Sequence, residues 1–134
     1  MLGDVIHEMT GNKVGWRVLP PDAQGPRMEI SYQGTGVMLG VETVETGTYT
    51  AVARPDGTFF ADGQGITIAN DGGIISWTSQ GIGTPDGKGV VSYRGVIFFQ
   101  STSPTFSRLG TVTGISEYEV REDGPLFGKV WDWK

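Results

Sequence analysis

The chain has 134 residues, a net charge of −5 at neutral pH and 22 glycines, and its length suits one domain covering residues 1–134. Its ten Lys and Arg residues stand singly, which counts against a nucleic-acid partner and against docking on an anionic membrane. The glycines follow no three-residue period, so collagen is excluded, and they alternate with aromatic and β-branched residues, as in a closed or sandwiched β-sheet.

The inventory of residues also limits the chemistry. The chain has no cysteine and a single histidine, His7, which excludes disulfides, thiolate metal sites and histidine clusters. Its Asp-Gly pairs are explained by hairpin turns, so we predict no metal site and no cofactor. No apolar run approaches the ~20 residues that span a bilayer, and the first residues lack the pattern of a signal peptide. We expect a cytoplasmic protein without a nucleic-acid or membrane partner.

Taken in chain order, runs of β-type residues alternate with turn signals. The expected strands are residues 1–9, 14–19, 27–33, 37–43, 48–54, 58–70, 74–83, 90–100, 111–121 and 126–134. Residues 11–13 are expected to form a turn, Gly34-Thr35-Gly36 a link, and Thr46-Gly47 a turn or bulge. Asx, Pro and Gly residues predict the later turns. This spacing is typical of an antiparallel meander.

Residues 90–100 form the longest β-type run, and Gly95 lies at its centre, where glycine is unfavourable in a strand. Glycines beside long polar side chains recur in the strand-like runs at Gly34, Gly63 and Gly81. Such glycines permit the bulges and coiling that a small barrel needs. We therefore predict an all-β fold, a single closed antiparallel barrel of about eight strands, whose interior is filled by side chains or holds one small ligand.

One segment, residues 103–110, interrupts the strand pattern. Ser103 suits a helix N-cap, Pro104 the first helical position, and Gly110 the end of a helix. We expect one or two turns of helix that plug an end of the barrel, with Phe106 and Leu109 facing inward.

Several glycine-containing segments resemble those of an uncharacterised family of small bacterial barrels, grouped with calycin-like and allene oxide cyclase-like folds. The segments are residues 63–65, 77–81, 92–95, 117–120 and 128–131. The likeness covers roughly residues 28–134 and implies an eight-stranded antiparallel barrel, often oligomeric, with a pocket at one mouth. Some members of the wider group are cyclases that use a buried carboxylate and an apolar cavity. No motif carries their catalytic residues over to this chain.

Four polar side chains near the middle of their strands form the leading candidate site. They are Gln64, Gln80, Arg94 and Glu117. On the inner face they could orient a carbonyl or carboxylate ligand, with Trp77, Tyr93 or Phe98 supplying stacking area. Glu117 could then carry a proton, with Arg94 as its catalytic partner. The alternative is that these residues form a buried salt-bridge network or simply face solvent.

Three functions remain open at this point. The leading one is binding of an apolar or amphipathic small molecule in the barrel cavity. The second is a cofactor-independent isomerase, cyclase or lyase that uses a buried carboxylate and Arg94. The third is a structural barrel with a filled core that forms homo-oligomers. A cavity separates the third function from the others, and a buried carboxylate that lines this cavity favours an enzyme over a carrier.

Overall fold

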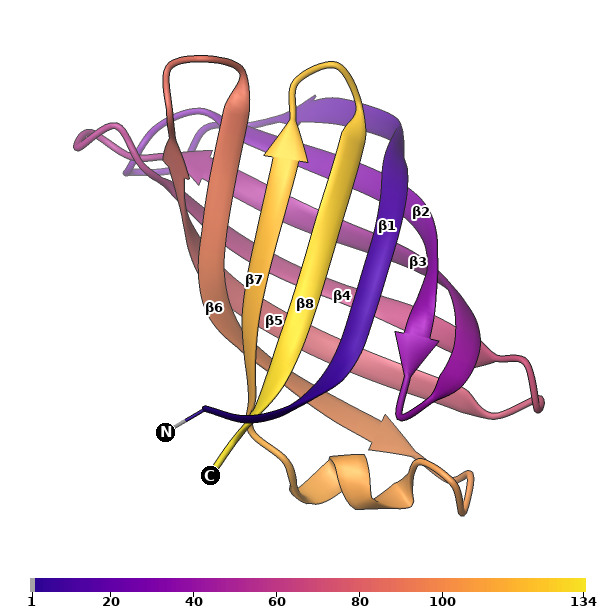
Figure 1. The fold of residues 1–134 in the computed structure, drawn as a ribbon. Coiled ribbons are helices and arrows are strands. Elements are labelled where there is room, and N and C mark those ends of the chain that lie inside the picture. Colours follow the sequence, from indigo (N-terminus) through magenta and orange to yellow (C-terminus); the bar gives the residue numbers. More distant parts are fainter. Residues whose placement is uncertain (1) are drawn as a thin grey trace.

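The computed structural model describes residues 2–134, which form a closed barrel of eight antiparallel strands (Figure 1). The strands are β1 (Leu2–Leu19), β2 (Arg27–Met38), β3 (Val41–Ala53), β4 (Phe59–Ala69), β5 (Ile74–Pro85), β6 (Val90–Ser101), β7 (Gly114–Arg121) and β8 (Pro125–Trp133). Each strand pairs with the next, and β1 closes the barrel against β8. The predicted all-β closed meander is confirmed.

Three stretches that the sequence suggested as turns or links lie inside strands. Residues 11–13 belong to β1, whose pairing with β2 only shifts register between Lys13 and Gly15. Gly34-Thr35-Gly36 lies inside β2, and Thr46-Gly47 lies inside β3. The predictions were wrong because these glycines allow close approach rather than a reversal. A Cβ on Gly36 would overlap the Glu8 carbonyl oxygen on β1.

The reversal between β2 and β3 occurs instead at Leu39-Gly40. Both residues have positive φ, 49° and 80°, as a two-residue type I′ hairpin requires. Leucine rarely adopts this conformation, but here its side chain packs against the hydrophobic core and its amide donates to the Ile6 carbonyl at 3.0 Å. Tertiary packing therefore holds a turn that the local sequence does not signal.

Large aromatic side chains inside the barrel lie directly opposite glycines of the neighbouring strand. The cross-strand pairs are Tyr32 with Gly47, Trp77 with Gly65, Tyr93 with Gly83, and Tyr118 with Gly128. A Cβ on Gly47 would lie 2.6 Å from the Tyr32 ring. These glycines therefore provide the space that the rings occupy, which accounts for four of the 22 glycines.

Replacing Gly128 with alanine is expected to lower the free energy of unfolding by about 1–3 kcal/mol, the usual range for overpacking a core. The added Cβ would overlap the ring of Tyr118. Gly15→Ala is the matched control, because nothing lies within 4 Å of a Cβ at that position of β1. Chemical denaturation measures both variants, and equal stability of the two would contradict this account of the glycines.

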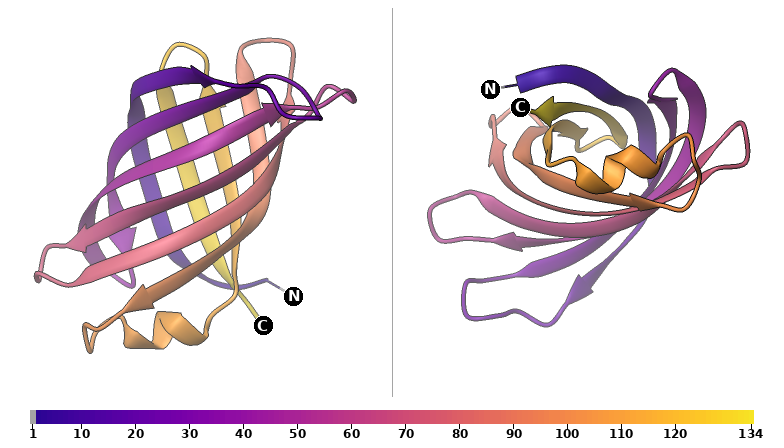
Figure 2. Two further views of the ribbon diagram at one scale, coloured as in Figure 1. Left: turned by 180° about the vertical axis from the view of Figure 1, so that it is seen from behind. Right: turned by 90° about the horizontal axis from the view of Figure 1, so that it is seen from below.

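A short 3₁₀ helix, η1 (Ser107–Thr111), crosses the lower end of the barrel, as the view from below shows (Figure 2). Phe106 and Leu109 are fully buried, so the predicted inward-facing plug is confirmed. The helix begins later than predicted, with Phe106 and not Ser103 at its N-cap, and Gly110 lies inside it rather than at its end. Phe106, Leu109 and Val112 each donate to the carbonyl three residues earlier, as in 3₁₀ structure. No helix within residues 2–134 is long and apolar enough to cross a membrane.

Candidate functional site

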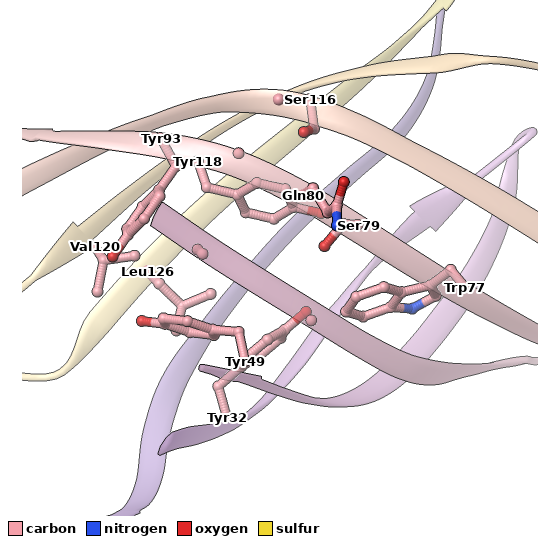
Figure 3. Close-up of a pocket in the computed structure, with 14 residues that line it drawn as sticks. Tyr32, Tyr49, Trp77, Ser79, Gln80, Tyr93, Ser116, Tyr118, Val120 and Leu126 are labelled. Atoms are coloured by element: carbon pink, nitrogen blue, oxygen red, sulfur yellow. The ribbon is translucent and has the colours of Figure 1, made fainter. Parts of the chain in front are cut away.

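The structure divides the predicted site residues between the two faces of the sheet. Trp77 and Tyr93 point into the barrel (Figure 3). The other predicted residues are at outward-facing positions of their strands: Gln64, Gln80, Arg94, Phe98 and Glu117. Of these, only Gln80 also contributes to the wall of the interior cavity within residues 2–134. The proposed polar cluster on the inner face is therefore not formed.

Arg94 and Glu117 do meet, but on the outside of the barrel. They lie directly opposite each other on β6 and β7, and Arg94 Nε lies 2.8 Å from Glu117 Oε1. Their side chains are 56% and 39% exposed. An ion pair this exposed to water contributes at most about 1 kcal/mol to stability. The pairing of the strands, and not a ligand site, accounts for this contact.

Arg94→Ala is accordingly expected to change the free energy of unfolding by less than about 1 kcal/mol. It is also expected to leave the interior cavity unchanged, because the side chain points away from it. Denaturant titration of Arg94→Ala, Glu117→Gln and the double variant measures this. A loss above 2 kcal/mol in either single variant, on the order expected for a buried pair, would show that the contact is shielded from water.

All four tyrosines of the chain line one interior cavity of about 60 Å³, together with Trp77. Tyr32 and Tyr49, from β2 and β3, face Tyr93 and Tyr118, from β6 and β7 (Figure 3). We call this space the tyrosine cavity. It is smaller than the roughly 150 Å³ cavity known to admit benzene, so it has room for a few waters or for the head group of a larger molecule.

An open depression of about 480 Å³ adjoins the tyrosine cavity. Its lining includes Val90 and Val91 at the start of β6 and Val120 near the end of β7, and these strand ends lie at the end of the barrel opposite η1 in Figure 1. The two spaces share Tyr49, Tyr93 and Val120 as lining residues. The wall of this depression, called the funnel below, is mainly apolar, and its lining includes Met28, Ile30, Ala51, Phe59 and Val91, with Lys13 and Glu122 as its charged members. The rings of Tyr49 and Tyr93 pack edge to face, 5.9 Å apart, and separate the funnel from the cavity.

The hydroxyl groups in the cavity are available as hydrogen-bond donors. Burial raises the pKa of Tyr93 to about 12 and raises the pKa of Tyr32, Tyr49 and Tyr118 still further. All four are therefore neutral phenols at physiological pH. No hydrogen bond within residues 2–134 engages the hydroxyls of Tyr49, Tyr93 or Tyr118, while that of Tyr32 donates to Glu45.

Glu45 and His7 form a buried pair directly behind Tyr32. Glu45 Oε1 lies 2.7 Å from His7 Nε2, and the two side chains are 1% and 2% exposed. Glu45 Oε2 accepts the hydrogen bond of the Tyr32 hydroxyl at 2.9 Å. His7 Nδ1 lies 3.1 Å from the Val37 carbonyl oxygen and must donate to it, since a carbonyl oxygen only accepts.

This geometry leaves two protonation states for the Glu45–His7 pair. One proton is shared between Nε2 and Oε1, so the pair is either imidazolium with carboxylate or imidazole with carboxylic acid. Its net charge is zero in both states, which limits the penalty of burial. Sequence reasoning missed the pair, because nothing local connects His7 to a residue 38 positions away. Within residues 2–134, no three His, Asp or Glu side chains gather as metal ligands.

Fold and site together define a small closed β-barrel with a tyrosine-lined cavity backed by a buried Glu–His pair. No protein-family model matches the chain, and no curated protein is significantly similar to it. Solved structures are similar over nearly the whole chain. A protein of unknown function from Clostridium acetobutylicum has 18% identity and a TM-score of 0.83, with 97% of each chain covered.

Two further structures share the barrel. A β-barrel-like protein from Acinetobacter baumannii has 13% identity and a TM-score of 0.84, covering 98% of this chain and 94% of its own. An enzyme from Penicillium herquei has 14% identity and a TM-score of 0.70, covering 97% and 92%. At these identities the likeness is one of fold alone. The structures that share this fold include a protein of unknown function and an enzyme.

Proposed function

We propose that the barrel binds an amphipathic small molecule, with a hydrogen-bond acceptor in the tyrosine cavity and an apolar body in the funnel. The observation that carries this proposal is that the hydroxyls of Tyr49, Tyr93 and Tyr118 have no hydrogen-bond partner within residues 2–134, although all three residues line the small cavity. Tyr49 and Tyr93 also line the apolar funnel. Phenols that stay neutral donate to an acceptor such as a ketone, lactone or ester oxygen.

The chemistry of the walls favours a ligand without a charged head group. The tyrosine cavity is lined by neutral side chains, and the Glu45–His7 pair behind it has no net charge. An ionic head group would therefore lose its hydration without gaining an opposite charge. The apolar part gains about 0.8 kcal/mol for each CH₂ group that it buries in the funnel.

The second candidate is a cofactor-independent isomerase, cyclase or lyase that uses the same cavity. A buried carboxylate, Glu45, supports it, since its hydrogen bond to Tyr32 connects it to the cavity. The resemblance to calycin-like and allene oxide cyclase-like barrels and the enzyme from Penicillium herquei are in keeping with both candidates.

The cytoplasmic location and homo-oligomerisation stay predictions. Self-association is supported by exposed apolar side chains on the outer face of β3, β4 and β5, namely Val44, Ile66, Ile68 and Ile74. Such side chains on adjacent strands are common at interfaces between subunits.

Binding can be tested by fluorine NMR of protein labelled with 5-fluorotryptophan. Trp77 lines the tyrosine cavity, whereas Trp16 and Trp133 are 67% and 57% exposed and serve as internal controls. The probe is 2-indanone, a flat apolar ketone, and indane is its matched analogue without the acceptor. We expect 2-indanone to shift the Trp77 resonance saturably, without shifting those of Trp16 and Trp133.

Indane is expected to bind at least about tenfold more weakly, the effect of one hydrogen bond of about 1.4 kcal/mol. Tyr118→Phe should weaken binding of 2-indanone while leaving that of indane unchanged. If 2-indanone gives no saturable shift of Trp77 up to its solubility limit, the proposal is wrong.

A further inference from the structure

We propose that Tyr32, Glu45 and His7 form a proton relay, which enables the cavity to exchange a proton on the carbon next to a carbonyl group. The substrate class is therefore enolisable ketones and related carbonyl compounds. This inference rests on the proposed binding of a carbonyl compound in the tyrosine cavity, and it adds a reaction to that binding.

The relay is continuous from the cavity to the main chain of β2. The Tyr32 ring lines the cavity, and its hydroxyl donates to Glu45 Oε2 at 2.9 Å. Glu45 Oε1 lies 2.7 Å from His7 Nε2, and His7 Nδ1 lies 3.1 Å from the Val37 carbonyl oxygen. Each carboxylate oxygen has one partner, so the orientation of the carboxyl group is fixed at both ends.

The burial of this pair also points to a function. Of the Asp, Glu, Lys, Arg and His side chains of residues 2–134, only those of His7 and Glu45 lie in the buried core, where the two residues are 3% and 4% exposed. A pair of this kind stabilises a fold no better, and often less well, than apolar residues of similar size. Buried titratable groups next to a cavity are typical of sites that transfer protons.

The reaction step follows from the hydrogen bonds. In the imidazolium–carboxylate state, the Tyr32 oxygen accepts a proton from the substrate carbon while the Tyr32 proton moves to Glu45 Oε2. The electron pair of the broken C–H bond forms the C=C bond of an enolate, and the carbonyl π electrons move to its oxygen. That oxygen accepts hydrogen bonds from free tyrosine hydroxyls of the cavity, such as that of Tyr118.

Return of a proton along the same path regenerates Tyr32 and the carboxylate. If Tyr32 exchanges its hydroxyl proton with a solvent water in the cavity before it returns a proton to the same carbon, the result is hydrogen exchange. If a proton returns to a conjugated carbon, the double bond moves. The substrate is neither oxidised nor reduced. Tyr32 is the catalytic residue, and Glu45 and His7 act through it. Burial and the nearby Glu45 charge raise the pKa of Tyr32, so its two proton transfers must be concerted.

The test uses 2-indanone in D₂O, with loss of its α-proton signals followed by proton NMR and binding followed in parallel by the Trp77 fluorine resonance. We expect exchange that saturates with binding and exceeds the buffer rate. In Tyr32→Phe and Glu45→Gln the exchange rate should fall at least about a hundredfold, the lower range of general acid–base catalysis, with the affinity for 2-indanone retained.

Glu45→Gln is the conservative variant, because its amide can still accept from Tyr32 and donate to His7 but cannot take up a proton. Arg94→Ala should exchange 2-indanone at the unmodified rate. Binding without exchange above the buffer rate would overturn the relay and leave the binding function standing, as would exchange that Tyr32→Phe and Glu45→Gln do not slow. Absence of binding would overturn both.

Discussion

Replacing Glu45 with alanine is expected to lower the free energy of unfolding by about 3–5 kcal/mol, the range for removing one partner of a buried pair. The variant leaves the Tyr32 hydroxyl and His7 Nε2 without their partner in the barrel interior. It also creates a cavity, because alanine lacks the atoms that filled the space between these two side chains. Urea or guanidinium denaturation measures the loss.

Glu45→Gln is the matched variant, and its expected loss is below about 1.5 kcal/mol, since every hydrogen bond of the network can still form. Its comparison with Glu45→Ala separates the hydrogen bonds and the volume from the ionisable carboxyl group. If Glu45→Ala lost less than about 1 kcal/mol, the network would not be buried and paired as the structure shows.

The second large effect is expected at high pH. In the folded protein the pKa of Tyr93 is raised to about 12 by burial, and those of Tyr32, Tyr49 and Tyr118 are raised further. In the unfolded chain all four ionise near their ordinary value of about 10. Stability contributed by these tyrosines is thus fully present below about pH 10 and is lost as the pH rises, because only the unfolded state releases the protons.

The slope of the unfolding free energy against pH follows from the difference in bound protons between the folded and unfolded states. Each tyrosine that is ionised in the unfolded state but not in the folded state lowers stability by about 1.4 kcal/mol per pH unit, so four give about 5.6 kcal/mol per pH unit between pH 10 and 12. Tyrosinate absorbance in the near ultraviolet should stay low until the protein unfolds and then rise cooperatively. Tyr93→Phe should reduce the slope by about a quarter. Ionisation near pH 10 in a still-folded protein would show that the cavity is open to water.

The tyrosine cavity, although small, is relevant to whether the barrel is structural, a carrier or an enzyme. A barrel filled completely by side chains would support only a structural role, whereas this cavity of about 60 Å³ adjoins an apolar funnel of about 480 Å³. The carboxylate that would favour an enzyme is present, but Tyr32 stands between it and the cavity. The 2-indanone experiments therefore distinguish a structural barrel, a carrier and an enzyme in one set of measurements.

Much of the fold is determined by short-range sequence. The turns after β3, β4, β5 and β7 follow from Pro, Asx and Gly residues, and the inward-facing Phe106 and Leu109 follow from their spacing in a short helical segment. These signals act within a few residues, so they can be read without knowledge of the partner strands. The turn at Leu39-Gly40 could not be read in this way, since packing against the core holds it.

The site depended on the tertiary structure. The strand at residues 90–100 has apolar side chains on both faces, so its composition did not show whether Arg94 or Tyr93 points inward. Tyr93 points inward because its ring fits over Gly83, which lies opposite it on the neighbouring strand β5. His7 and Glu45 are 38 residues apart, and only closure of the barrel brings them together. Local sequence thus determined the bounds of the strands from β4 onward to within a few residues. Strand pairing and barrel closure determined the extents of β1 to β3 and which side chains meet inside.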